Sequence, residues 1–252
     1  MNPTHRRAAF LGVQLDLLDL RDAVAVIEEA LGNGRAIAHL GVNAANLILA
    51  RDQESYRNDL IAADLVTADG QSVVWGARLF GIDVPERVAG IDLMEALLAR
   101  ARERGWSTFL LGARADVVAA LARRLERDGL RIAGYRDGYF SDDAAAGVVS
   151  GVKRSGADLL FVGLPSPQKE RLIIQHARPA GIGLSMGVGG SFDVLSGRLK
   201  RAPALVQRLG LEWLYRLLQE PRRLFARYAI TNTRYLLLLV GEASRRRRRS
   251  GR

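Results

Sequence analysis

The segment Leu159-Leu-Phe-Val-Gly163-Leu-Pro-Ser-Pro-Gln168-Lys-Glu170 decides the fold: an apolar run ends at a glycine, and a proline-containing loop follows. An apolar run of this length between turn signals is typical of a strand buried in a parallel sheet. Similar runs recur along the chain. They predict strands over residues 36–42, 65–67, 108–111, 131–135, 159–162 and 183–188.

Segments with apolar residues three and four positions apart separate these runs, and this is the spacing of amphipathic helices. They cover residues 20–31, 92–104, 116–127 and 142–155, and Ser141 or Asp142 could cap the last one. Strands that alternate with helices predict an α/β fold, in which helices flank a largely parallel sheet. In such sheets, ligands bind beyond the carboxyl ends of the strands.

Glycines follow several of the predicted strands. Gly112 and Gly163 each end an apolar run, and Gly189-Gly190-Ser191 follows the last one. Glycines at these places allow backbone amides to approach a phosphate group closely. None of the loops completes a G-x-G-x-x-G or Walker A motif, so each could equally be a tight turn between a strand and a helix.

Positive charge is concentrated at the C-terminal end. The net charge of the chain is +10, and residues 198–252 contain fifteen Lys and Arg against three acidic residues. The rest of the chain is close to neutral. This asymmetry predicts that one end meets a polyanion: nucleic acid, an anionic membrane surface or a phosphate-rich ligand.

The composition excludes other classes of site. The chain has no cysteine and only three scattered histidines, which argues against disulfides and against a Cys- or His-based metal cluster. No signal peptide is recognisable, and the longest strongly apolar run, residues 236–240, is far too short to span a bilayer. We therefore expect a cytoplasmic or peripheral protein.

Residues 203–240 are predicted to be helical and amphipathic, with a second helix that begins at Pro221. Apolar and aromatic residues interleaved with arginines are typical of a helix at a membrane interface. The Arg245–Arg249 run would strengthen attraction to an anionic leaflet, or it could be a solvated tail. The predicted organisation is a catalytic α/β domain over residues 1–200, a basic amphipathic appendage over 201–243 and a disordered tail over 244–252.

A series of motifs in fixed order resembles the WecG/TagA/CpsF family of glycosyltransferases and spans about residues 10 to 235. The motifs are Gly41–Asn46, Thr67–Ser72, Glu86–Leu93, Phe109–Gly112, Gly138–Phe140, Gly163–Glu170, Gly187–Asp193, Arg201–Pro203, Gly210–Arg216 and Glu220–Arg223.

The resemblance implies a Rossmann-like fold with a C-terminal helical appendage that meets the inner face of the plasma membrane. It implies an inverting transfer from a UDP-sugar to an undecaprenyl-diphosphate-linked saccharide, as part of cell-surface polysaccharide or teichoic acid synthesis. Donors in the family carry N-acetylmannosamine, its uronic acid, glucose or glucuronic acid. The UDP-sugar and the polyprenyl-diphosphate acceptor are substrates, and we expect no further cofactor; a homo-oligomer is possible.

The resemblance also implies roles for three polar residues at strand ends. Asp69 matches the proposed catalytic base, although an aspartate here could instead cap a helix that begins near Gln71. Asn43 could hydrogen-bond the sugar or the acceptor, or cap a helix. Gln168 matches a glutamine of the family's active site, and the prolines beside it could simply shape the loop.

Several residues are predicted to bind substrate. Arg87 could hold a phosphate or a sugar carboxylate, or form a surface ion pair with Glu86 or Asp83. The glycine loops with Gly112, Gly163, Gly189, Gly190 and Ser191 suit a diphosphate or nucleoside. Arg216 and Arg223 match family arginines thought to hold the lipid diphosphate.

The chain departs from the family at two positions and has no Asp-x-Asp metal motif. Gly41 stands where the family usually has threonine, and Ala226 stands where it has a third arginine. Arginines and helix N-termini can neutralise a leaving diphosphate without a metal, so we expect a metal-independent enzyme.

Three other classes of protein stay open on the sequence. The basic tail suggests a nucleic-acid-binding protein, but it matches no nucleic-acid-binding motif. A dinucleotide-dependent oxidoreductase would be expected to carry G-x-G-x-x-G. A non-catalytic membrane scaffold would leave the polar residues at the strand ends unexplained.

Overall fold

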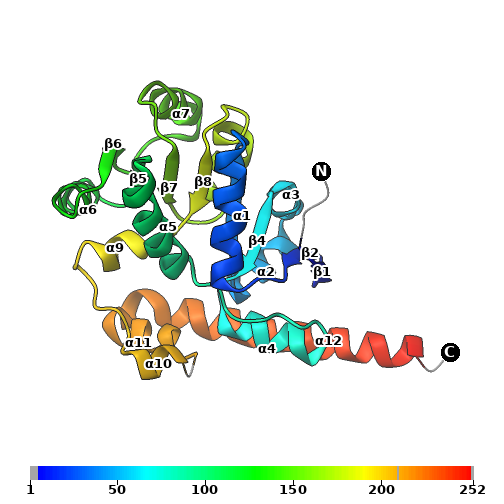
Figure 1. The fold of residues 1–252 in the computed structure, drawn as a ribbon. Helices are drawn as coiled ribbons and strands as arrows, with labels where there is room; N and C mark the ends of the chain where they lie inside the picture. Colours follow the sequence, from blue (N-terminus) through cyan, green and yellow to red (C-terminus); the bar gives the residue numbers. More distant parts are fainter. Residues whose placement is uncertain (1–4, 209, 251–252) are drawn as a thin grey trace.

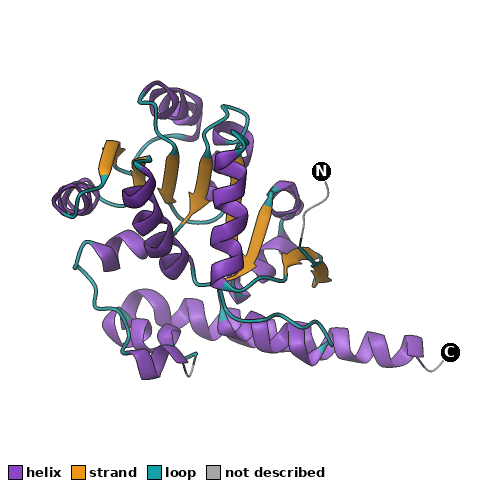
Figure 2. Ribbon diagram, viewed as in Figure 1, coloured by secondary structure: helices purple, strands orange, loops and turns teal. Residues whose placement is uncertain are grey.

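A computed structural model of the chain describes residues 5–208 and 210–250. A six-stranded parallel sheet forms the centre, in the order β4-β3-β8-β7-β5-β6. Helices cover both faces of the sheet (Figures 1 and 2). The strands are β3 (Ile37–Val42), β4 (Leu65–Ala68), β5 (Ser107–Gly112), β6 (Arg131–Arg136), β7 (Leu159–Gly163) and β8 (Leu184–Gly187). The predicted α/β class and all six predicted strands are confirmed.

The four predicted helices are also present. They are α1 (Leu20–Gly32), α5 (Gly90–Arg104), α6 (Ala115–Arg127) and α7 (Ala145–Arg154), the last preceded by a short 3-10 turn over Asp142–Ala144. The sequence analysis missed the shorter ones, whose few turns give a weak apolar period. These are α2 (Ala44–Asp52), α3 (Glu54–Ala62), α4 (Gln71–Leu79), α8 (Gln168–Leu172) with a π turn over Ile173–Ala177, and α9 (Ser191–Leu195).

Two apolar cores lie on opposite faces of the sheet, because successive side chains of a strand point to opposite faces. In β7, Leu159 and Phe161 pack with α1, α5 and α6, whereas Leu160 and Val162 pack with α2, α4 and α7. Both sets are fully buried. The uninterrupted apolar run of β7 is therefore explained by burial on both faces.

An antiparallel hairpin near the N-terminus was not predicted. Strands β1 (Arg7–Phe10) and β2 (Val13–Asp16) pair around Leu11 and Gly12, which both have positive φ. A two-residue turn with positive φ at both positions matches the twist of the two strands that it connects. The hairpin was not predicted because strands of four residues are too short for their alternation of apolar and polar residues to be detected. The buried Asp16 carboxylate anchors the hairpin to the sheet by accepting hydrogen bonds from the backbone of Val66 at 2.6 Å and from Arg7 at 3.0 Å.

The C-terminal segment is helical: α10 (Ala204–Arg208), α11 (Glu212–Gln219) and α12 (Pro221–Ser250). The predicted helix start at Pro221 is confirmed. The tail was expected to be disordered from residue 244, but α12 continues through Ser250, because arginine has a high helix propensity and neither proline nor glycine interrupts residues 242–250. Residues 251–252 and the side chains of residues 246–250 lie outside the described part of the chain.

The long helix α12 crosses the α/β domain beside α2 and α4 (Figure 1). The buried Tyr235 hydroxyl donates to the Ser72 carbonyl at 3.0 Å, and Arg234 pairs with Asp52 at 2.7 Å. Trp213 of α11 meets Tyr228 of α12 edge to face, with ring centroids 5.9 Å apart. Among the described helices, none is long and apolar enough to cross a membrane.

A buried histidine makes stability depend on pH. His39 lies in β3 with Nε2 2.9 Å from the Thr67 hydroxyl, and desolvation lowers its pKa to about 3. The unfolded chain takes up this proton near pH 6.5, so the free energy of unfolding should fall as the pH drops below that value. The loss from this group should be about 2 kcal/mol between pH 6.5 and pH 5.

Urea unfolding of the wild type and of His39→Gln at pH 7.5 and pH 5 measures how much His39 contributes to the pH dependence of the free energy of unfolding. Glutamine can still reach Thr67 but does not titrate, so the variant should lose less stability at pH 5 than the wild type. Equal losses in the two proteins would contradict the assignment.

Candidate functional site

Asn43 and Asp69 lie side by side at the carboxyl edge of the sheet. They follow β3 and β4, which are neighbours with Val42 opposite Ala68. Two glycines allow the approach: a Cβ on Gly41 would lie 3.1 Å from the Asp69 Cβ, and one on Gly70 would lie 3.0 Å from the Asn43 Cβ. The threonine that the family usually carries at Gly41 would crowd Asp69 in this arrangement.

The Asp69 carboxylate holds the start of α5. Its Oδ1 accepts a hydrogen bond from the Gly90 backbone amide at 2.8 Å, and α4 begins at Gln71, after Gly70, with no side-chain cap. The alternative that Asp69 caps α4 is therefore wrong. Asp69 is partly accessible as a residue, but protein atoms surround its carboxyl group. This desolvation raises the pKa of Asp69. The Gly90 amide, Arg87 and Lys169 each act to lower that pKa and oppose the rise.

Asn43 caps α2, as the alternative interpretation predicted. Its Oδ1 accepts from the amides of Ala45 at 3.0 Å and Asn46 at 3.3 Å, and the Asn46 side chain accepts from the Asn43 amide at 3.0 Å. This reciprocal capping box fixes the backbone where β3 meets α2. The cap engages the side-chain oxygen, and a role for Asn43 toward a sugar stays a prediction.

A buried polar network lies behind Asn43 and was not predicted. Asn46 donates to the Tyr56 hydroxyl at 2.6 Å and to the Ser166 hydroxyl at 3.3 Å. Glu170 Oε1 accepts from Tyr56 at 3.0 Å and from Ser166 at 2.8 Å, and it also contacts the Lys169 ammonium. The network ties the loop after β7 to the start of α2. Its sequence signal was faint, because Lys and Glu in a loop are usually solvated.

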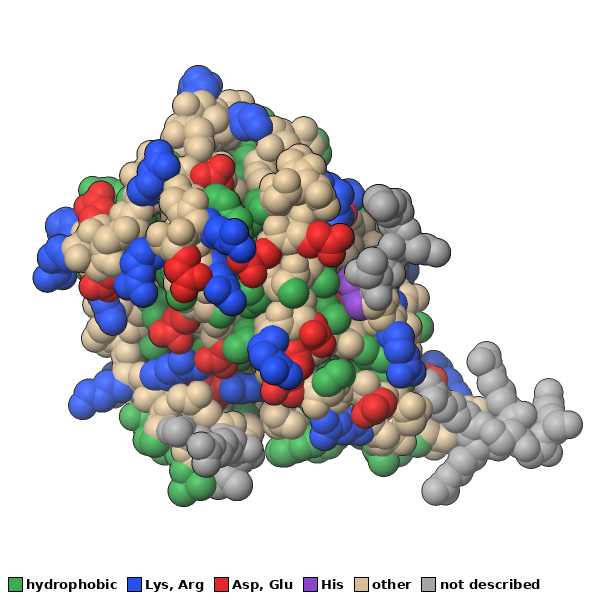
Figure 3. Space-filling model, in the orientation of Figure 1, with side chains coloured by type: hydrophobic (Ala, Val, Ile, Leu, Met, Phe, Trp, Pro, Cys, Tyr) green, Lys and Arg blue, Asp and Glu red, His purple; other side chains and the backbone are tan. Residues whose placement is uncertain are grey.

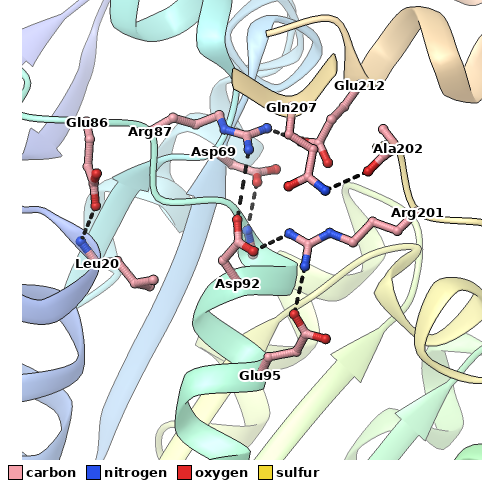
Figure 4. A network of polar contacts seen from close by, with 11 residues as sticks. Leu20, Asp69, Glu86, Arg87, Asp92, Glu95, Arg201, Ala202, Gln207 and Glu212 are labelled. Carbon is pink, nitrogen blue, oxygen red and sulfur yellow. Dashed lines mark hydrogen bonds and ion pairs between the residues drawn. The ribbon is translucent and has the colours of Figure 1, made fainter. Parts of the chain in front are cut away.

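Arginines and carboxylates join the sheet domain to the C-terminal segment (Figure 4). Arg87 pairs with Glu212 of α11 and lies 3.9 Å from Asp92 of α5. Arg201 pairs with Asp92 and, at 2.8 Å, with Glu95. The predicted surface pair of Arg87 with Glu86 or Asp83 is therefore wrong, because the guanidinium points toward α11; Glu86 instead accepts from the Leu20 amide at 2.8 Å.

Arg216 of α11 covers the glycine turn after β8. A Cβ on Gly190 would lie 2.9 Å from the Arg216 Cζ, so this position must stay glycine for the guanidinium to pack there. Gly189 has φ +50°, and a Cβ on it would meet no atom within 4 Å. The Ser191 hydroxyl donates to the Val188 carbonyl at 2.8 Å and stabilises the turn. Arg216 and the turn thus form one positively charged rim at the end of β8.

Comparison with protein-family models gives one match, to the family described as glycosyl transferase WecG/TagA/CpsF, over residues 8–249. The match covers nearly the whole chain. The chain belongs to the WecG/TagA/CpsF family. It is thus a glycosyltransferase, and the family indicates a role in the biosynthesis of cell-surface polysaccharide.

Other predicted site residues of this family member lie farther along the same edge. Gly112 has φ +132°, and a Cβ there would lie 2.7 Å from the Gly163 Cα; a Cβ on Gly163 would lie 2.8 Å from the Phe192 ring. Both glycines are required by packing, and their binding roles stay predictions. The side chain of Arg223, near the start of α12, lies outside the described residues.

Gln168 borders a small hollow rather than Asp69. The hollow is lined by Gln168, Phe140, Asp142, Ala145, Arg171, Leu172 and His176. The next residue, Lys169, instead packs against Gly187 and acts on the Asp69 charge. The structure brings Asn43, Asp69 and Arg87 together, and it places Arg216 over the glycine turn after β8. Within the described part of the chain, no group of three or more His, Asp or Glu residues could hold a metal ion.

The ion pair of Glu212 with Arg87 should hold α11 against the sheet domain. In Glu212→Gln we expect amide hydrogen exchange in α11 to accelerate about fivefold, the effect of about 1 kcal/mol from a partly exposed pair. Exchange measured by mass spectrometry tests this. Asp116→Asn, which breaks an exposed pair with Arg114, serves as the control. Unchanged exchange in α11 would show that Trp213 and its apolar neighbours hold the helix without the pair.

Proposed function

We propose that this glycosyltransferase moves a sugar from a UDP-sugar to a polyprenyl-diphosphate-linked saccharide, with inversion at the anomeric carbon and Asp69 as the base. One observation carries the proposal: a desolvated Asp69 carboxylate stands at the carboxyl edge of the sheet, with Arg87 near enough to lower its pKa, while Arg216 covers the glycine turn after β8. The donor sugar is of the N-acetylmannosamine type or of the glucose and glucuronic acid type.

The proposed step is a single displacement. Asp69 Oδ1 is held by Gly90, and Oδ2 takes the proton from the acceptor hydroxyl. The acceptor oxygen forms its bond to the anomeric carbon as the bond from that carbon to the UDP oxygen breaks. The electron pair of the broken bond leaves with the diphosphate, and one displacement inverts the configuration.

Positive groups near the glycine turn would stabilise the leaving diphosphate. Arg216 packs over Gly190, and the backbone amides of Gly189 and Gly190 border the same rim. Fixed positive groups at the place where charge develops contribute strongly to transfer reactions. Arg87 could join them only by leaving Glu212, so we infer that substrate competes for its guanidinium. We propose that these groups act without a metal ion.

Asp69→Asn should abolish transfer. Loss of the base should lower kcat/KM about 10²- to 10⁴-fold, with folding unchanged. Radiolabelled UDP-sugars of the four types are offered with polyprenyl-diphosphate saccharides, and Asp128→Asn, an exposed carboxylate after α6, is the control. Because burial raises the pKa of Asp69, wild-type activity should fall on the acid side above the ordinary range of an aspartate.

Transfer that survives in Asp69→Asn would move the base elsewhere. Transfer that is lost in chelator and restored by Mg²⁺ would contradict the metal-independent mechanism. No transfer from any donor by folded wild-type protein would contradict the proposed substrates.

A lipid-linked acceptor requires a surface that meets the membrane, and we propose that α10, α11, α12 and α4 form it. Hydrophobic side chains gather along the lower edge of the molecule over α10, α11 and α4 (Figure 3). The exposed ones are Trp75, Leu79, Leu205, Trp213, Leu214, Leu218, Phe225, Ile230, Leu236, Leu237 and Val240. Apolar residues beside a basic segment are suited to an anionic lipid surface, here the inner face of the plasma membrane.

Leu218→Glu should weaken this association. Leu218 is 73% exposed, and an acidic group in its place loses apolar burial and is repelled by anionic lipid, so binding should fall at least about tenfold. Sedimentation with phosphatidylglycerol vesicles measures it. Ile61→Glu, on the exposed side of α3, is the matched control. Equal binding of both variants and the wild type would contradict the proposed surface.

A further inference from the structure

Lys169 is a buried cation at the start of α8. Its side chain is 8% exposed. Its ammonium donates to the Ser166 hydroxyl at 2.5 Å and contacts Glu170 Oε1. Burial of a lysine is costly unless it is paired, and here Glu170 and the network of Tyr56 and Ser166 compensate it. The structure thus holds one cation at a defined place below the carboxyl edge of the sheet.

Gly187 contacts Lys169 and lies near Gly90, whose amide donates to Asp69. A Cβ on Gly187 would lie 3.1 Å from the Lys169 Cε, so the lysine stem packs directly against this backbone. A Cβ on Gly90 would lie 3.9 Å from both the Gly187 carbonyl oxygen and Asp69 Oδ1. The absence of a side chain at residue 187 lets the lysine lie close to the carboxylate.

We propose that Lys169 is a positioning residue of the transfer reaction: held by Glu170 and Ser166, its ammonium stabilises the ionised form of Asp69 that accepts the proton. The inference rests on the proposed function, because it gives Asp69 the role of base. Of the two adjacent residues Gln168 and Lys169, it is Lys169 that is given the role of stabilising the Asp69 carboxylate. The Gln168 side chain borders the hollow near Phe140 and His176.

The charges that face Asp69 come from three elements. Arg87 and Lys169 lower its pKa, and Glu212 raises it, while the Gly90 amide also lowers it by its hydrogen bond. Arg87 already pairs with Glu212, whereas Lys169 of α8 pairs with Glu170. Loss of the lysine charge should therefore raise the pKa of Asp69 further, and the base would be protonated at a higher pH.

The test compares Lys169→Gln with a double variant and one control. Glutamine can still donate to Ser166, and the double variant Lys169→Gln, Glu170→Gln removes both charges, so that no buried carboxylate is left unpaired. Lys153→Gln removes an exposed lysine that donates to the Gly181 carbonyl. Circular dichroism and thermal unfolding establish which variants are folded.

Two readouts are made on each folded variant: the pH profile of kcat/KM and a ¹³C NMR titration of the Asp69 carboxyl without substrate. In Lys169→Gln and in the double variant, the acid limb and the carboxyl titration should both move to higher pH. On that limb kcat/KM should fall about threefold to tenfold. Lys153→Gln should leave both readouts in place.

An Asp69 titration that is the same with and without the lysine would overturn the inference. A fall in kcat/KM by the same factor at every pH would also overturn it, because it would show a purely structural role. If wild-type protein transfers no sugar, the proposed function fails, and the NMR titration still decides whether Lys169 stabilises the Asp69 carboxylate.

Discussion

The hydrogen bond from the Gly90 amide to Asp69 links the parts of this site. It joins the end of β4 to the start of α5 at 2.8 Å, and α5 carries Asp92 and Glu95. These two carboxylates hold Arg201, and Arg87 pairs with Glu212 of α11. The base proposed for catalysis is thus also the anchor of the helix that binds the C-terminal segment. A movement of α11 would shift the partner of Arg87, which also lies near Asp92, within the first turn of the helix that Asp69 anchors.

A second constraint is the buried network around Glu170. Glu170 Oε1 accepts hydrogen bonds from Tyr56, Ser166 and Lys169. Asn46 connects these residues to the capping box at Asn43. A buried polar group is costly unless it is fully paired, so the members constrain one another's positions. The loops after β3 and β7 are held together in this way, although about 120 residues of chain separate them.

The sequence predicted the sheet well and the site in part. All six parallel strands were predicted, and continuous apolar runs marked the central ones, because burial on both faces leaves little choice of residue; the edge strand β6 is largely exposed. The two four-residue strands of the hairpin were not predicted, since four residues are too few to show the alternation of buried and exposed side chains that is typical of a strand. Asn43 and Asp69 were found from their places after strands. Lys169 was missed beside Gln168, because adjacent residues of a short helix point in different directions and only packing against Gly187 shows which one faces Asp69.

By itself, the sequence determined the α/β class, the strand-end positions of Asn43 and Asp69, and the basic, amphipathic character of the C-terminal segment. These properties follow from local periodicity and composition. Only the tertiary structure decided that Asp69 caps α5 rather than α4, that Arg87 pairs with Glu212, and that Lys169 is buried near the base. Each of these depends on contacts between distant segments, and strand order brings those segments together in a way that no local pattern encodes.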